Sequence, residues 1–220
     1  MKKYNLFLLF FFLPSLLFAS DYQISRLSSR DMYVQKSAPM KTFEYEGNLL
    51  VSNQVHDEYI SLIRFDISTL PTLSPDGRAY VLLYNNTRKP NQLVESLTSS
   101  EISVSLLYTN MNPKATWKNS FALYKKADAL AKSVKVEYGG YWTSIEITDY
   151  YNYWKANTTR NKGFMLRSQS GSELYSFSST KNRNVDERPI LRLKDENKSA
   201  GTIFLVPSVS RPSSANMCRG

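Results

Sequence analysis

Cysteine, histidine and long apolar segments are scarce in this 220-residue sequence. The one cysteine, Cys218, lies close to the C-terminus, so an internal disulfide is excluded and the hydrophobic core must supply the stability. Cys218 is expected to be either an unused thiol or one half of an intermolecular bridge. Beyond Phe18, no segment is apolar enough to span a membrane.

Histidine-based catalysis has a single candidate, His56. This residue lies in a polar loop, residues 54–58, with acidic neighbours on one side only. A catalytic triad or a zinc site needs partners that the sequence does not offer, so we expect a solvated loop histidine. A glycine-rich phosphate loop is also missing, since Gly139-Gly140 is an isolated break in a strand pattern.

Carboxylates are present, but their spacing does not indicate catalysis. Glycoside hydrolysis uses two carboxylates at a defined separation. No spacing singles out such a pair among the acidic candidates, which are Asp57, Glu58, Glu137, Glu146 and Asp149. We therefore predict a protein that is not an enzyme, with a polysaccharide lyase or hydrolase as the alternative.

The N-terminal segment has the features of a secretory signal peptide. A basic start precedes the apolar run Leu6–Phe18, which is too short for a comfortable membrane span, and Ala19-Ser20 offers a small-residue cleavage point. We expect residues 1–20 to be a signal peptide, residues 21–196 to be one domain and residues 197–220 to be a flexible tail. The mature protein is then extracellular or periplasmic; a retained anchor is the alternative.

Positive charge exceeds negative charge throughout the chain. With 28 Lys and Arg against 19 Asp and Glu, the formal charge is +9, and loss of Lys2 and Lys3 with the leader lowers it to +7. A basic surface favours anionic partners such as acidic polysaccharide, nucleic acid or a membrane surface. The plain alternative is a basic surface that serves only solubility.

Strand patterns predict an all-β fold, an antiparallel two-sheet sandwich of jelly-roll type with one short helix. The segment Tyr59–Pro71 is apolar on both faces at its start, as expected of a central strand. Arg64 and Asp66 follow on one face, where we expect structural core pairing because buried charges need partners. The helix is predicted at Tyr150–Lys155, with Trp154 in the core.

The order of short motifs along the chain resembles the DNRLRE domains, secreted β-jelly-roll modules that include alginate-type carbohydrate-binding modules. The matching segments are Asp31–Val34, Asn48–Val51, Leu62–Ile67 with Leu70-Pro71, Ala115–Trp117, Ile145–Thr148 leading to Trp154, Lys162–Leu166, Phe177–Ser179 and Arg188–Leu191. Three features depart from the family pattern: Glu146 replaces its usual Asp, Thr180 replaces its usual Glu, and residues 118–135 form a lysine-rich insertion. The resemblance implies a non-catalytic module that binds polysaccharide, or an adhesive or matrix role built on that binding.

Basic residues recur beside aromatic residues, which suits recognition of acidic sugars. Aromatic faces stack on sugar rings, and lysine or arginine binds uronate carboxylates. The candidate carbohydrate-binding residues are Lys41, Tyr45, Trp117, Lys118, Tyr124, Lys126, Arg160 and Lys162. Trp117 is equally compatible with a core position. The alternative partner is a surface or matrix protein, whereas nucleic acid is disfavoured for an exported protein.

No cofactor is required by this interpretation, although a calcium site is an alternative. Calcium prefers carboxylate oxygens, which makes Asp31 and Asp149 the candidate ligands. Ion pairing with Arg64 or Arg188 explains such acidic residues equally well, and Arg188 is accordingly predicted to be structural.

Overall fold

The computed structural model describes residues 20–25, 29–54, 57–87, 101–124, 131–136, 141–168 and 173–195. Cys218, His56, Lys126, the segment 1–19 and the C-terminal tail lie outside these ranges. The strands are β1 (Ser20–Ser25), β2 (Ser29–Gln35), β3 (Asn48–Asn53), β4 (Glu58–Phe65), β5 (Arg78–Asn85), β6 (Glu101–Leu106), β7 (Lys132–Lys135), β8 (Tyr141–Glu146), β9 (Phe164–Ser168), β10 (Tyr175–Ser178) and β11 (Ile190–Asp195). The helices are α1 (Trp117–Tyr124) and α2 (Thr148–Ala156), with 3₁₀ turns η1 (Thr158–Arg160) and η2 (Val185–Glu187). Of the helices described, none has the length and apolar character needed to cross a membrane.

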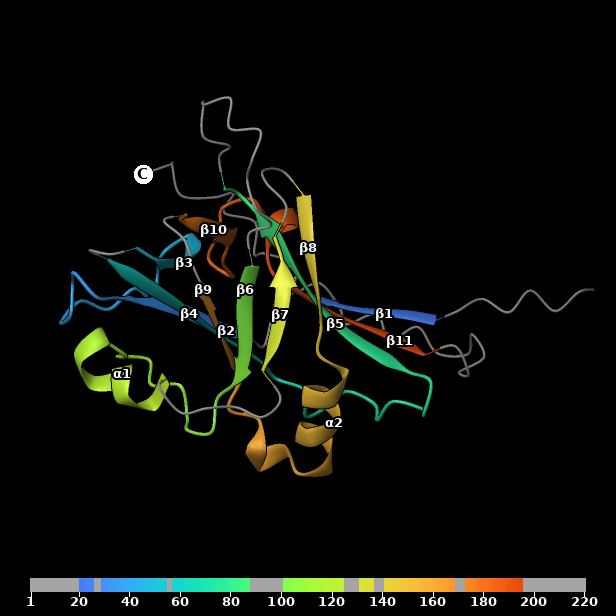
Figure 1. Ribbon diagram of the computed structural model, residues 1–220. Helices are drawn as coiled ribbons and strands as arrows, with labels where there is room; N and C mark the ends of the chain where they lie inside the picture. Colours follow the sequence, from blue (N-terminus) through green and yellow to red (C-terminus); the bar gives the residue numbers. More distant parts are fainter. Residues whose placement is uncertain are drawn as a thin grey trace, which may run out of the picture.

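The strands pair in antiparallel fashion and form two layers (Figure 1). In sheet A, β5 pairs with β8 on one edge and with β11 and β10 on the other, while β1 pairs with β11. In sheet B the order is β2-β4-β9-β6-β7. Strand β3 connects the layers because it pairs with β10 and, at its end, with β4. The predicted fold class, an antiparallel β-sandwich of jelly-roll type, is confirmed.

Strand β4 is buried on both faces, as its sequence predicts. Ile63 and Phe65 point into the core between the sheets, and Ile60 and Leu62 point to the outer face of sheet B. The outer pair belongs to a second apolar cluster that includes Trp117 of α1, so the helix covers this face. Both faces of the strand therefore lose contact with water.

Arg64, near the end of β4, is half-buried, and Asp66, just beyond the strand, is exposed, so the predicted pairing in the core is wrong. The Asp66 carboxylate accepts a hydrogen bond from the Ser68 N–H at 3.0 Å. This bond and the nearby Arg64 guanidinium lower the pKa of Asp66, so the pair acts at the surface rather than as a buried ion pair.

Helix α1 was not expected from the sequence, although its start has a recognisable capping pattern. The Thr116 side chain accepts from the Asn119 N–H at 3.3 Å, and the Asn119 side chain accepts from the Thr116 N–H at 2.8 Å. These reciprocal bonds satisfy two free amide groups in the manner of a capping box.

Helix α2 closes one end of the sandwich through aromatic residues. Tyr150, Tyr151 and Trp154 are at most 1 % exposed and belong to the core. The Tyr150 hydroxyl donates to the Val104 carbonyl at 2.8 Å, and the Tyr151 hydroxyl donates to the Pro71 carbonyl. The helix thus ties together sheet B and the loop that follows β4.

Replacement of Gly163 by alanine is expected to destabilise the fold strongly. Gly163 has a φ of 92°, and an added Cβ would lie 2.4 Å from the Ile63 carbonyl oxygen. Backbone strain and this clash together should cost about 2 kcal/mol or more in the free energy of unfolding, measured by urea denaturation. Gly47→Ala is the control, since its Cβ would meet only the Asn182 Cα at 3.9 Å. An equal effect of both variants would contradict the prediction.

Stability is expected to fall at alkaline pH. Burial is the main cause that raises the pKa of Tyr33 and of Tyr59 from 10.0 to about 12. Because the folded state holds these protons more tightly, their contribution is fully present below pH 10 and is lost as the pH rises through about 12. The free energy of unfolding, measured against pH, should decline over this window, and Tyr33→Phe should make the decline smaller. Parallel curves for the variant and the wild type would show that Tyr33 is not responsible.

Candidate functional site

Aromatic side chains lie on the outer face of sheet A, where Trp142 is exposed and Tyr80 and Tyr84 are half-buried. Tyr84 of β5 is opposite Trp142 of β8, and their rings meet edge to face with centroids 5.4 Å apart. Trp142 is 39 % exposed. Tyr80 points to the same face of β5, about 13 Å from Tyr84 along the strand. Between the two tyrosines, Leu82 and its partner Ile190 form an apolar floor.

Basic side chains extend this face at the end away from Trp142. Arg192 of β11 is opposite Tyr80, and Lys194 is opposite Arg78. The Lys194 ammonium lies 6.0 Å from the centroid of the Tyr80 ring. We call the set Arg78, Tyr80, Leu82, Tyr84, Trp142, Ile190, Arg192 and Lys194 the sheet-A strip.

The charges of the strip are only partly neutralised within the described residues. Arg78 lies 3.9 Å from a carboxylate oxygen of Glu146, which is half exposed. No described acidic side chain pairs with Arg192, and its buried Nε has no hydrogen-bond partner there. A guanidinium binds a carboxylate through two parallel hydrogen bonds, so Arg192 is the strip residue best suited to an anionic ligand.

The strip was missed in the sequence, although a signal for it exists. Every position of segment 79–84 is apolar or aromatic, and its even-numbered positions are Tyr80, Leu82 and Tyr84. Alternate positions of a strand share one face, so these residues form a row of their own. Ser144 and Glu146 continue the same outward alternation in β8.

The two tryptophans for which the sequence analysis makes a prediction, Trp117 and Trp154, are both buried. Trp117 is 8 % exposed and packs in the cluster under α1, so its ring does not offer a face to a sugar. Trp154 is 1 % exposed and lies in the core, where it was expected. The backbone of Tyr124 ends helix α1. Its side chain, like Lys126, lies outside the described residues.

The remaining predicted sugar-binding residues form two separate groups rather than one site. Lys41 and Tyr45 lie in the connection between β2 and β3, and the Lys118 N–H donates to the Pro39 carbonyl of that connection at 2.9 Å. Arg160 and Lys162 lie beyond α2, at the end of the sandwich that α2 closes (Figure 1). The Arg160 guanidinium there lies 5.1 Å from the centroid of the Tyr153 ring.

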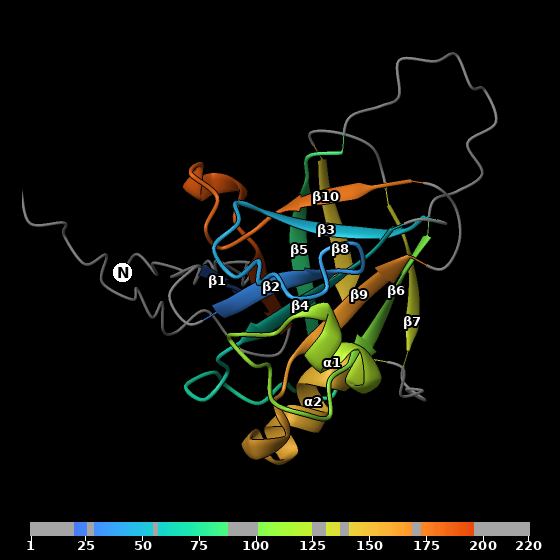
Figure 2. The ribbon, with the colours of Figure 1, turned by 90° about the vertical axis from the view of Figure 1, so that its left-hand side faces the viewer.

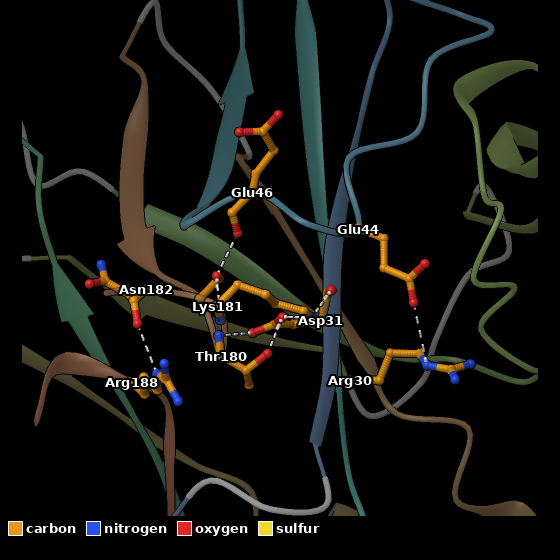
Figure 3. Close-up of polar contacts among 9 residues, drawn as sticks. Arg30, Asp31, Glu44, Glu46, Thr180, Lys181, Asn182 and Arg188 are labelled. Atoms are coloured by element: carbon orange, nitrogen blue, oxygen red, sulfur yellow. Dashed lines mark hydrogen bonds and ion pairs between the residues drawn. The ribbon is translucent and has the colours of Figure 1, made fainter. Parts of the chain in front are cut away.

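A lysine ammonium binds the carboxylate of Asp31, one of the two candidate calcium ligands. Figure 3 shows the Asp31 side chain held by Thr180 and Lys181. Its oxygens accept from the Thr180 N–H at 2.6 Å, from the Thr180 hydroxyl at 2.7 Å and from the Lys181 ammonium at 2.6 Å. Asp31 is fully buried, so its charge is compensated inside the protein. The Arg188 Nε donates to the Asn182 carbonyl in the same turn, at 2.9 Å.

The second candidate ligand, Asp149, lies at the surface in α2. Its carboxylate is 62 % exposed and forms an ion pair with the Lys132 ammonium at 3.0 Å. Throughout the part of the chain that the structure describes, no three His, Cys, Asp or Glu side chains gather in a way that could hold a metal ion. A lysine is thus the charged partner of each of these two carboxylates.

An antiparallel β-sandwich that presents aromatic and basic side chains on one sheet face is suited to bind sugars, because rings stack on aromatic faces and charged groups bond to basic side chains. The family comparison agrees, since the model of carbohydrate-binding module family 96 matches residues 23–195. The chain belongs to this family. A comparison with curated proteins finds no match.

Loss of the Lys181 ammonium is expected to be costly. Lys181→Met would leave the buried Asp31 carboxylate without a countercharge, which should lower the free energy of unfolding by about 3 kcal/mol. Lys132→Met is a matched control, because both lysine side chains are 28 % exposed but the Lys132 partner is at the surface. The free energy of unfolding of the control, measured like that of Lys181→Met by urea denaturation, should fall by at most about 1 kcal/mol. Similar losses for both variants would mean that burial of Asp31 is not the determining factor.

Proposed function

We propose that this protein is a secreted, non-catalytic module that binds acidic polysaccharide of the uronate type through the sheet-A strip. The observation that carries the proposal is the row of aromatic rings on a single sheet face, with Trp142 exposed and Tyr80 and Tyr84 half-buried, that continues into basic residues. A sugar chain that lies along β5 would stack on Trp142 and Tyr80 and meet Arg192 and Lys194. The DNRLRE resemblance supports secretion and a non-catalytic role.

Charge supports an acidic ligand rather than a neutral one. The whole chain carries +9, and the strip holds Arg78, Arg192 and Lys194, of which Arg78 faces Glu146 and Lys194 lies opposite Asp21 of β1 in the strand register. A uronate polymer carries one carboxylate per sugar unit, so several charges can be met at once. Such binding weakens as salt screens the charges, whereas stacking on aromatic rings does not depend strongly on salt.

The proposed recognition uses side chains of the strip alone and needs no metal ion. Lysine ammonium groups already bind the candidate calcium ligands Asp31 and Asp149. Binding should therefore persist in a chelating buffer.

Substitutions in the strip should separate stacking from charge recognition. Calorimetric titration is carried out with alginate, pectate and a neutral glucan, at low and high salt and with chelator present. Trp142→Ala should weaken binding of the uronates about tenfold, which is about 1.4 kcal/mol. Arg192→Gln should cause a similar loss that shrinks as salt rises, since the lost interaction is electrostatic.

Arg160→Gln is the matched control, because it removes the same charge from the surface beside α2. Its affinity should stay within about twofold of the wild type, a difference of about 0.4 kcal/mol. The proposal is wrong if the wild type binds none of the three glycans, or if the strip variants bind the uronates as tightly as the wild type does.

A further inference from the structure

A pocket with a volume of about 110 Å³ lies beside α1 on the outer face of sheet B. Three apolar side chains line part of it, Leu62 of β4 and Leu107 and Met111 of the connection between β6 and α1. These residues belong to the apolar cluster under α1 and are 1 %, 4 % and 7 % exposed. The apolar area that they leave open is therefore small, enough for one methyl group but not for the face of a ring.

Neutral polar side chains form the rest of the lining. Thr109, Asn110 and Asn112 come from the same connection, and Asn119 and Ser120 come from α1. Among the lining residues, all of which lie in the described part of the chain, none carries a charge. A charged ligand group that entered this pocket would lose water without gaining a countercharge, so the pocket favours a neutral ligand.

The connection that forms the pocket is held in place by its own hydrogen bonds. At its start, the Leu107 N–H donates to the Gly163 carbonyl at 2.9 Å. Further along, the Lys114 N–H donates to the Asn112 side-chain oxygen at 2.9 Å, and the Asn119 amide group donates to the Lys114 carbonyl at 3.2 Å. A pocket that is formed in advance binds a small ligand with less loss of conformational entropy.

Hydrogen-bonding groups at the rim of the pocket are available to a ligand. Thr109 and Asn110 are exposed, and neither side chain has a hydrogen-bond partner within the residues that the structure describes. The Asn112 oxygen is occupied by the Lys114 N–H, but its NH₂ group has no acceptor among the same residues. Amide and hydroxyl groups side by side match the adjacent hydroxyl groups of a sugar, each of which can both donate and accept.

The volume of the pocket limits the ligand to one edge of a single sugar unit. A closed cavity of roughly 150 Å³ holds one benzene ring. The pocket beside α1 is smaller, so a six-membered sugar ring can enter it only in part. An edge that carries one apolar group next to hydroxyl groups fits the lining best.

The pocket and the sheet-A strip belong to different sheets. Figure 2 shows α1 in front of sheet B, with β5 and β8 of sheet A behind. A ligand in the pocket therefore does not touch the strip, and the two sites can be tested separately.

We propose that this pocket binds the edge of a 6-deoxyhexose, a neutral sugar with a methyl group in place of the usual hydroxymethyl group. The methyl group contacts Leu62, Leu107 and Met111, and neighbouring ring hydroxyls bond to Asn110 and Asn112. A hexose with the full hydroxymethyl group would place a hydroxyl against the apolar residues, where it loses its hydrogen bonds to water. This binding is independent of the strip and adds a neutral sugar to the ligands of the protein.

Matched pairs of sugars test the methyl contact. The full-length protein is titrated by NMR with L-fucose and L-galactose, and with L-rhamnose and L-mannose, because the members of each pair differ only in the hydroxyl group at carbon 6. Each deoxy sugar should bind about fivefold more tightly than its partner or better. In saturation-transfer spectra, its methyl protons should receive the strongest signal. N-acetylglucosamine, whose methyl group belongs to an acetyl substituent, serves as the reference sugar.

Variants of the protein locate the site. Thr109→Ala/Asn110→Ala removes two exposed side chains, so the double variant should fold, as circular dichroism will show. It should bind L-fucose about tenfold more weakly, since two hydrogen bonds are lost. Asn152→Ala is the matched control, because Asn152 is an exposed asparagine of α2 outside the pocket. This control and Trp142→Ala should both bind L-fucose as tightly as the wild type does.

Equal affinity for L-fucose and L-galactose would show that the methyl contact does not exist and would overturn the proposal. Tighter binding of N-acetylglucosamine than of either deoxy sugar would overturn the choice of a 6-deoxyhexose. The pocket is not the site if neither deoxy sugar binds, if L-fucose binding survives the double variant, or if Trp142→Ala abolishes it.

Discussion

Burial of both faces of β4 is the constraint on which the arrangement of the molecule depends. Ile63 packs between the sheets while Ile60 and Leu62 pack under α1, and all three are at most 1 % exposed. Burial of each such side chain is worth about 1.5–3 kcal/mol. Helix α1 covers the outer face of sheet B, whereas the outer face of sheet A carries the sheet-A strip with its exposed Trp142.

The fold was largely predictable because alternation in strands is a local signal. The pattern of Tyr59–Pro71 identified the central strand, and the spacing of Tyr150, Tyr151 and Trp154 identified α2. The exact end of the strand was less predictable. Asp66 is the first residue after β4, and because it lies outside the strand its carboxylate is exposed rather than buried. Helix α1 was not predicted, because its only signals in the sequence are Trp117 and the capping residues Thr116 and Asn119.

The candidate site was much harder to predict than the fold. Whether an aromatic ring is exposed depends on which face of a sheet is covered by another element. That is decided by tertiary packing, which the local sequence pattern does not show. Trp117 was compatible with surface or core, and the packing of α1 places it in the core. Tyr80 and Tyr84 were concealed by apolar neighbours, because a strand apolar at every position does not reveal which of its faces is open. The charge of Asp31 was recognised, but its lysine partner lies 150 residues away in the chain.

The different burial of the three tryptophans has a spectroscopic consequence. Trp154 and Trp117 are 1 % and 8 % exposed, whereas Trp142 is 39 % exposed and lies in the strip. Indole emission depends on contact with water, so the native protein has one solvent-sensitive fluorophore against two shielded ones. A soluble quencher such as iodide or acrylamide should therefore act mainly on the Trp142 component. The wild-type sequence thus contains an optical reporter at one end of the sheet-A strip, with no label required.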